Sequence, residues 1–153
     1  MTIEEKMIQM EVTLPPAPAK GGIYASVKPL SEKLYYVSGC GPLILGKGPV
    51  GKISTDLTIQ EGQAAARLAM MNFLSVIRSN IGELERIKSF VKVLVFVAGP
   101  ENFYEQPTVA DGATGLLTEL FGEEVGAPSR SAIGASSLPG NVPVEIEGII
   151  EVI

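Results

Sequence analysis

The segment 142–152, VPVEIEGIIEV, alternates apolar and acidic residues with a period of two. One face carries Val142, Val144, Ile146, Ile150 and Val152, and the other carries Glu145, Glu147 and Glu151, with Ile149 as its one large apolar residue. This alternation is typical of a β-strand with one buried face and one solvent face. Such a strand needs a sheet and a covering layer, so we expect helices packed against one side of a sheet. Gly148 interrupts the apolar face, which predicts a bulge or a close approach of another backbone.

Two segments are predicted to supply the helices of that layer. A capping box formed by Thr58 and Glu61 begins the first, which ends at Gly82. Pro107 suits the first turn of the second helix, which is predicted over 107–121. The buried face of the first helix is predicted from apolar residues at helical spacing: Ala66, Met70, Phe73 and Ile77, widened by Ala64, Leu68 and Met71.

The other regular segments are predicted to be strands, apart from a short N-terminal helix over 2–13 and a proline-rich leader over 14–22. The predicted strands are 23–27, 33–37, 90–97 and 129–137, with short extended pieces at 43–45 and 52–54. The turn-rich sequence at 138–141 predicts a hairpin between the last two strands. These elements indicate one α+β domain over 1–153, with two helices on one face of a mixed sheet.

Composition excludes several classes of function. Among 153 residues the net charge is −5, and the scattered lysines and arginines do not form the basic cluster that nucleic acids require. There is no histidine, which excludes Ser-His-Asp and Cys-His catalysis and most zinc sites. With one cysteine, no signal-peptide pattern and no long apolar run, we expect a cytoplasmic protein without an internal disulfide.

The stretch GKGPVGKIS, which begins at Gly46, comes within one residue of a phosphate-binding loop. Gly51 and Lys52 match the G-x-x-x-x-G-K-[ST] pattern, but Ile53 stands where a metal-binding hydroxyl belongs. The next helix is predicted to begin only at Thr58, so its N-terminus would not point at a phosphate. An ordinary glycine-rich connection is therefore favoured.

Arg130 opens a strand of small residues, RSAIGASS. Ala132, Gly134 and Ser136 share its face and leave room for a planar anion, which an arginine can hold through two hydrogen bonds. The alternative is an ordinary salt bridge to one of the acidic residues of the last strand, namely Glu145, Glu147 or Glu151.

The predicted hairpin also gives a distance between Arg130 and Glu145. If Ser137 pairs with Val142, Glu145 lies opposite Gly134, about 13 Å from Arg130 along the sheet. Both side chains could then grip one small ligand only across a symmetric subunit interface.

The stretch SGCGP at 38–42 ends a predicted strand. Glycines at this point would let backbone groups approach a ligand closely, and the alternative is a bulge or a sheet corner. Cys40 is expected to be a buried, small apolar residue, since no histidine is present to activate it.

Together, the stretches YVSGCGPL and PSRSAIGASSLPGNVPVEIEGIIEV and the order of the elements resemble the RidA/YjgF family of reactive-intermediate deaminases. The likeness spans roughly residues 22–153, and the preceding helix and leader resemble an extension found in one divergent branch. The resemblance implies a chorismate-mutase-like α+β fold, assembled as a homotrimer with clefts between the subunits.

The resemblance also implies an activity. Family members with the arginine hydrolyse small reactive imines and enamines to 2-keto acids and ammonia, without a metal or an organic cofactor. By position, Arg130 would bind the substrate carboxylate and Glu145 would orient the hydrolytic water. The implied lining of the cleft is Tyr24, Ser38, Gly39 and Ala132.

Three positions depart from the family pattern. Many relatives carry cysteine where this chain has Ala132, and glutamine where it has Cys40. Asp111 stands where relatives often place asparagine, and its carboxylate would weaken anion binding at Arg130 by repulsion. Two alternatives stay open: a non-catalytic protein that binds or senses small carboxylates, and an endoribonuclease or translation inhibitor, a common label for the family that the net charge of −5 does not favour.

Overall fold

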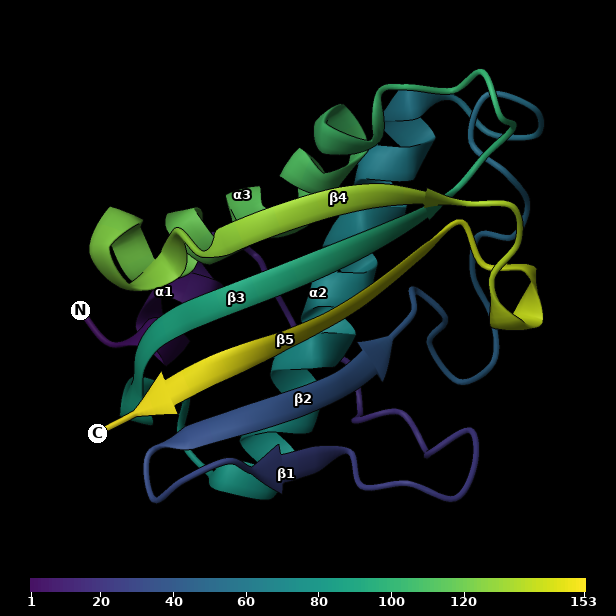
Figure 1. Cartoon of the computed structure of the whole chain (residues 1–153). Helices are drawn as coiled ribbons and strands as arrows, with labels where there is room; N and C mark the ends of the chain where they lie inside the picture. The colour runs from purple at the N-terminus through teal and green to yellow at the C-terminus, as the bar shows by residue number, and fades with distance from the viewer.

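The computed structural model describes all of residues 1–153 and contains one five-stranded mixed sheet (Figure 1). The strand order is β1-β2-β5-β3-β4, and only the β3–β4 pair is parallel. The strands are β1 (Val27–Pro29), β2 (Leu34–Cys40), β3 (Ile87–Ala98), β4 (Ser129–Ala135) and β5 (Val144–Val152). The predicted α+β class with a mixed sheet is confirmed.

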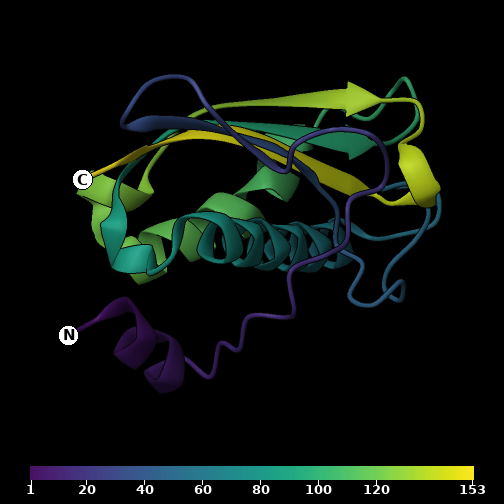
Figure 2. The same ribbon diagram turned by 90° about the horizontal axis from the view of Figure 1, so that it is seen from below.

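The elements form three layers (Figure 2). Helices α2 (Ile59–Ile81) and α3 (Gln106–Gly126) cover one face of the sheet, and α1 (Ile3–Gln9) lies beyond them. A cluster of 31 buried residues joins the layers. The other face of the sheet carries no helix (Figure 1). None of the helices combines the length and hydrophobicity that a membrane crossing needs.

Helix α2 has the ends that the sequence predicts. Thr58 Oγ1 accepts a hydrogen bond from the Glu61 N–H (3.1 Å), and the Glu61 carboxylate accepts one from the Thr58 N–H (2.8 Å). Gly82 ends the helix with a φ of 99°. The predicted stripe of Ala66, Met70, Phe73 and Ile77 is buried.

The predicted widening of that stripe was wrong. Ala64 is exposed, and Leu68 and Met71 are only half-buried. A second helix as well as the sheet packs against α2, so its buried surface extends in another direction. The additional buried residues include Ala65, Ala69, Asn72, Leu74 and Ser75.

Helix α3 begins with Pro107 in its first turn, as predicted, and leaves helical geometry at Gly122 (φ 77°, ψ 171°). At Gly112, a Cβ atom would collide with the backbone carbonyl of Gln63 in α2. The absence of a side chain therefore lets the two helices approach closely, and this contact fixes the neighbouring Asp111 at the helix surface.

The predicted hairpin between the last two strands was wrong. Strand β4 pairs in parallel with β3, and β5 lies between β3 and β2, so β4 and β5 are not neighbours. The connection contains a 3-10 turn at Pro139–Asn141 and returns the chain on the other side of β3 (Figure 1). The turn residues indicate a reversal correctly, but a reversal does not determine the partner strand.

Two further predictions near the N-terminal half of the sheet were wrong. Strand β1 begins at Val27, whereas the sequence predicts 23–27. Pro29 is tolerated there because β1 is an edge strand. The pieces at 43–45 and 52–54 form only isolated bridges within turns.

The irregularity expected at Gly148 is confirmed. A Cβ atom there would collide with the Lys92 carbonyl oxygen, and β3 carries a bulge between Phe90 and Lys92 opposite this part of β5. A second irregularity lies between Val37 and Cys40 of β2, which extends beyond its predicted end at residue 37.

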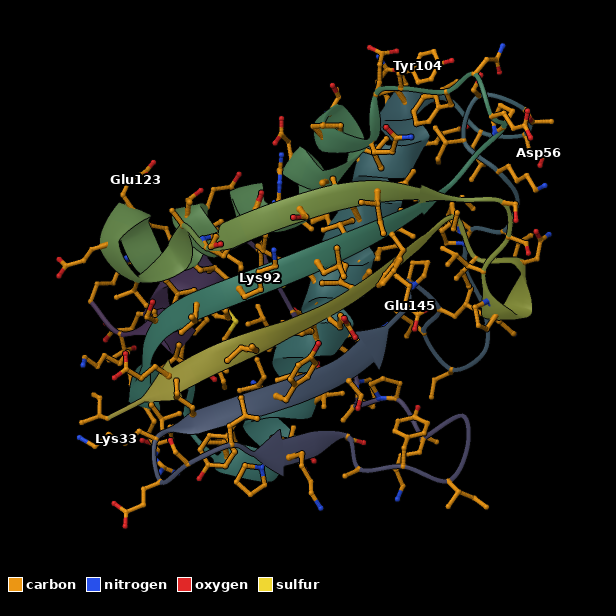
Figure 3. All side chains as sticks on the ribbon, in the orientation of Figure 1. Lys33, Asp56, Lys92, Tyr104, Glu123 and Glu145 are labelled. Atoms are coloured by element: carbon orange, nitrogen blue, oxygen red, sulfur yellow. The ribbon has the colours of Figure 1, made fainter.

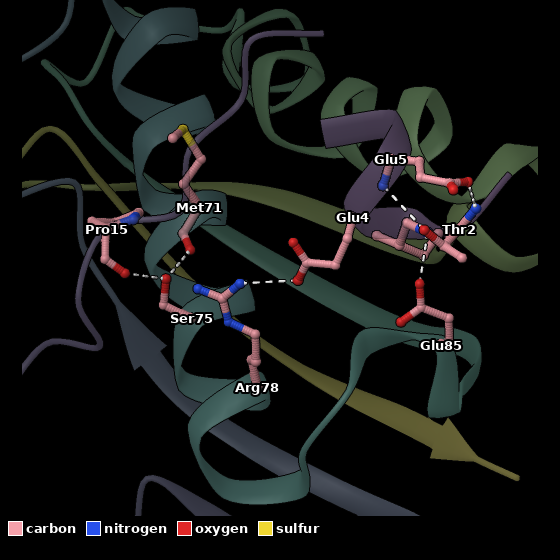
Figure 4. Close-up of polar contacts among 9 residues, drawn as sticks. Thr2, Glu4, Glu5, Pro15, Met71, Ser75, Arg78 and Glu85 are labelled. Carbon is pink, nitrogen blue, oxygen red and sulfur yellow. Dashed lines mark hydrogen bonds and ion pairs between the residues drawn. The ribbon is translucent and has the colours of Figure 1, made fainter. Parts of the chain in front are cut away.

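Helix α1 is capped by Thr2 (Figure 4), and it is shorter than the predicted 2–13. Glu4 pairs with Arg78 of α2 at 3.2 Å. Lys6 Nζ donates to the carbonyl oxygen of Leu120 in α3 at 3.0 Å. The N-terminal helix is thus tied to both covering helices.

The leader is irregular, as predicted, and is held against α2. The buried Ser75 hydroxyl donates to the Pro15 carbonyl oxygen at 2.7 Å (Figure 4). From this point the leader runs toward β1 and passes the mouth of a cavity.

Candidate functional site

A cavity of about 230 Å³ opens beside the end of β2. Four of the predicted site residues line it: Tyr24, Ser38, Gly39 and Glu145. The other lining residues come from the leader, the β2 end, α2 and the turn before β5, and are Pro18, Ala19, Lys20, Ser26, Cys40, Gly41, Leu43, Asn72, Val76, Pro139 and Val142. Residues far apart in sequence therefore meet in one concave site.

The Glu145 carboxylate lies over Gly39 (Figure 3 labels Glu145). A Cβ atom at position 39 would collide with Glu145 Oε1, so only glycine leaves room for this side chain. Burial, reinforced by the charge of Glu147, raises the pKa of Glu145. A carboxyl group with a raised pKa in a cavity is suited to accept and return a proton.

Two hydroxyl groups of the cavity are held by backbone groups. Ser38 Oγ donates to the Ala25 carbonyl oxygen at 2.7 Å, and the Tyr24 hydroxyl accepts a hydrogen bond from the Gly21 N–H at 3.0 Å. Because these bonds leave further lone pairs on both oxygens, each hydroxyl can still accept from a ligand.

Cys40 is buried, as the sequence predicts. Burial, together with the charge of Glu145, raises the pKa of the Cys40 thiol to about 12. The thiol therefore stays protonated at neutral pH and does not serve as a nucleophile.

Arg130 and Glu145 lie on opposite faces of the sheet. Arg130 pairs with Val93, whose side chain is buried under the helices, whereas Glu145 pairs with Phe96 on the open face. They are separated by about 10 Å along the strands and about 10 Å across them. One chain therefore cannot place both groups on one small ligand. The sequence analysis predicted the same separation, although it did so from a hairpin that the structure does not contain.

The Arg130 guanidinium is bound by α3. Nη1 donates to Asp111 Oδ1 at 2.7 Å and to Thr114 Oγ1 at 3.1 Å, while Nη2 and Nε make no hydrogen bond. Ala132 lies on the same face of β4 and is half-buried. Arg130, Ala132 and Asp111 thus form a second group, separate from the cavity.

The alternative salt bridges between Arg130 and the glutamates of β5 were wrong. The Tyr36 hydroxyl donates to Glu147 at 3.0 Å, and this hydrogen bond raises the pKa of Tyr36. Glu151 pairs with Lys88 at 2.9 Å. Both acidic side chains therefore have structural partners on neighbouring strands.

Asn72 is a cavity residue that the sequence reasoning missed. It is 1% exposed, and its Nδ2 donates to the carbonyl oxygens of Gly41 (2.8 Å) and Leu43 (2.9 Å), which holds the chain after β2 against α2. Its Oδ1 is buried without a hydrogen-bond partner. The available signal was an amide on the buried side of an otherwise apolar helix.

In the glycine-rich stretch after β2, backbone N–H groups donate hydrogen bonds to other groups of the protein. The Gly51 N–H donates to the Asn141 carbonyl oxygen at 2.8 Å, and the Lys52 N–H donates to Asp56 Oδ2 at 2.9 Å. The next helix begins only after Thr58. The expectation of an ordinary connection in place of a phosphate loop is confirmed.

A model of the family described as "YjgF/chorismate mutase-like, putative endoribonuclease" matches residues 4–146. The chain belongs to this family. Protein TCP17 of Trypanosoma cruzi is 38% identical to it over 144 residues, which are 94% of this chain and 89% of that protein.

Two solved structures of the YjgF fold superpose closely on this chain. Atu1372 of Agrobacterium tumefaciens, a protein of unknown function, has a TM-score of 0.89 and 35% identity, covering 99% of this chain and 92% of that one. A protein of Shewanella oneidensis described as "a putative endoribonuclease" has a TM-score of 0.93 and 30% identity, covering 99% of this chain and 100% of that one. Both matches include α1 and the leader, as expected for a branch of the YjgF family with an N-terminal extension.

Proposed function

We propose that this protein hydrolyses small reactive 2-imino acids, and the enamines in equilibrium with them, to 2-keto acids and ammonia. The observation that carries the proposal is Glu145, a carboxyl group with a raised pKa that lies over Gly39 in a cavity of small-molecule size. The resemblance to the RidA/YjgF deaminases supplies the type of reaction.

The chemistry requires little from the protein. The carbon of a protonated imine is already electrophilic, so positioning a water and moving its protons can suffice. Glu145 accepts a proton as the water oxygen attacks C2 and returns it to nitrogen. As the carbinolamine C–N bond breaks, the hydroxyl proton passes to the departing ammonia, which leaves as ammonium. The balance is R–C(=NH2+)–COO− plus H2O to R–CO–COO− plus NH4+, with no change of oxidation state.

In this proposal Arg130 binds the substrate carboxylate from a neighbouring copy of the chain. The open face of the sheet carries Leu94, Phe96 and Ile149, which are half-buried, and Ile133, which is 44% exposed. A second copy packed on this face would cover apolar surface. A cyclic homotrimer would place the β4 edge of one copy against the cavity of the next.

The test is ammonia release from enzymatically generated 2-aminoacrylate. Arg130→Ala and Glu145→Gln should each reduce turnover by at least about a hundredfold while the oligomer stays intact. Arg67→Ala is the matched control, because Arg67 lies on α2 and pairs with Glu119 at 3.1 Å. Undiminished turnover by Arg130→Ala would reject the assignment.

A second candidate is non-catalytic binding of small carboxylates. TdcF of Escherichia coli, which this chain resembles in fold with a TM-score of 0.61 and 21% identity, has been solved with bound serine. Calorimetric binding of 2-keto acids without hydrolysis of any imine would favour this candidate. RNA cleavage, the third, predicts steeply salt-dependent RNA binding, which a net charge of −5 does not support.

A further inference from the structure

The two edges of the Arg130 guanidinium have different surroundings. Nη1 is occupied by Asp111 and Thr114 of α3, whereas Nη2 and Nε have no partner. The Arg130 side chain is 22% exposed, so solvent reaches it. An incoming carboxylate can therefore bind the open edge through two hydrogen bonds without displacing Asp111.

The charges around this arginine determine which carboxylates it favours. The charges of Arg130 and Asp111 cancel, because the two side chains form an ion pair. A simple monoanion bound to Arg130 would therefore place a second negative charge beside the Asp111 carboxylate. Asp111 also lines a surface hollow with Arg67 and Glu119, an ion pair 3.1 Å apart whose two charges cancel. A ligand with a cationic nitrogen next to its carboxylate would avoid the repulsion, because Asp111 would then face that nitrogen.

We infer that Arg130 and Asp111 together form a subsite selective for zwitterions. The open edge of Arg130 binds the carboxylate, and Asp111, whose Oδ2 has no hydrogen-bond partner, accepts from the adjacent nitrogen. For the reaction this inference rests on the proposed function: the substrate is then the protonated 2-imino acid, whose carboxylate and nitrogen stand on neighbouring carbons. Asp111 is a specificity-determining residue of that site.

This arrangement has a consequence for turnover. The iminium form is the one that water attacks most readily, and a neighbouring carboxylate favours it over the neutral imine. Hydrolysis removes the cationic nitrogen as ammonium and leaves a monoanionic 2-keto acid on Arg130. Asp111 then repels the product, so the same pair retains the substrate and promotes release of the product.

The experiment compares two ligands of nearly equal size, L-alanine and pyruvate, by calorimetry on the full chain. We expect the wild type to bind alanine about fivefold more tightly, the size expected for an exposed charge pair. Asp111→Asn keeps an oxygen that can accept from Arg130 but removes the charge, so the preference should vanish. Glu124→Gln, a change of an exposed residue on the same helix that makes no ion pair, should leave the preference unchanged.

Equal affinities in the wild type, no binding of either ligand, or an unchanged ratio in Asp111→Asn would each overturn the inference. If Asp111→Asn does not fold, the wild type alone decides, because the preference must shrink at high salt. The outcome is separable from the deaminase proposal. A preference for alanine without imine turnover keeps the subsite and rejects the reaction, and turnover without the preference rejects only the subsite.

Discussion

Arg130 and Glu145 are offset by three positions in the register of the sheet and point to opposite sides of it, since Arg130 pairs with Val93 and Glu145 with Phe96. Both side chains are required by the proposed reaction. Any site that uses both side chains must therefore take one from each of two copies of the chain. Whether the site is shared in this way can be tested by mixing variants that each lack one of the two residues.

Mixing two inactive variants should restore activity. When Arg130→Ala and Glu145→Gln chains are unfolded together and refolded in equal amounts, about a quarter of the sites in a cyclic oligomer receive both intact residues. We expect about a quarter of the wild-type ammonia release per site. Each variant refolded alone is the control. A mixture no more active than its components would show that the two residues do not share a site.

Gly39→Ala should displace Glu145 without unfolding the protein. The added methyl group would collide with the end of a flexible side chain, which can swing away. We expect the circular dichroism spectrum to be preserved and the turnover to fall about a hundredfold. Gly115→Ala is the control, because a Cβ atom at Gly115 meets no neighbouring atom. Full activity of Gly39→Ala would mean that the position of Glu145 over this glycine is unimportant.

Glu145→Gln should stabilise the protein at neutral pH but not in acid. Burial raises the pKa of Glu145 above its ordinary 4.5, so the folded protein favours the protonated carboxyl group. Its contribution to the free energy of unfolding is therefore fully present below about pH 4.5 and is lost as the pH rises through the raised pKa. Glutamine does not titrate. Its melting temperature should match that of the wild type near pH 4 and exceed it by about 1–3 °C at pH 8.

Thermal melts across this pH range measure the difference, with Glu32→Gln as an exposed control that should show no such trend. A Glu145→Gln variant that is less stable than the wild type at pH 8 would contradict the role of burial.

Cys40 should resist thiol reagents in the native protein. A pKa near 12, against an ordinary 9.0, reduces the thiolate fraction at pH 8 about a thousandfold. We expect slow labelling by a disulfide reagent in buffer, and rapid labelling of the single thiol in denaturant. Fast labelling of the folded chain would show that the thiol is more accessible than its burial indicates.

The sequence predicted most reliably those features that depend on local chemistry. The capping box at Thr58 and the helix end at Gly82 need only neighbouring residues, and both are present. The alternation along β5 predicted its buried face for the same reason. These signals depend on residues only a few positions apart, so the elements can be predicted without knowledge of the tertiary structure.

The errors that bear on the candidate site concern the partners of elements and residues. The turn at 138–141 was correct, but β5 is the central strand and pairs with β3 and β2, while β4 lies at the edge beside β3. Arg130 was expected to bind a glutamate of β5 or a ligand, whereas Asp111 approaches it from α3. The close contact of Gly112 with Gln63 likewise sets the distance between α3 and α2. Periodicity within a segment carries no information on such distances.

The attachment of α1 also determines when the protein can be completed during synthesis. Lys6 reaches the carbonyl oxygen of Leu120, 114 positions later in the chain. At roughly 5–20 residues per second, the ribosome needs about 6–23 s to supply that partner. Until then α1 can form its ion pair with Arg78 of α2 but not its contacts with α3, so the helix that is made first completes its packing late.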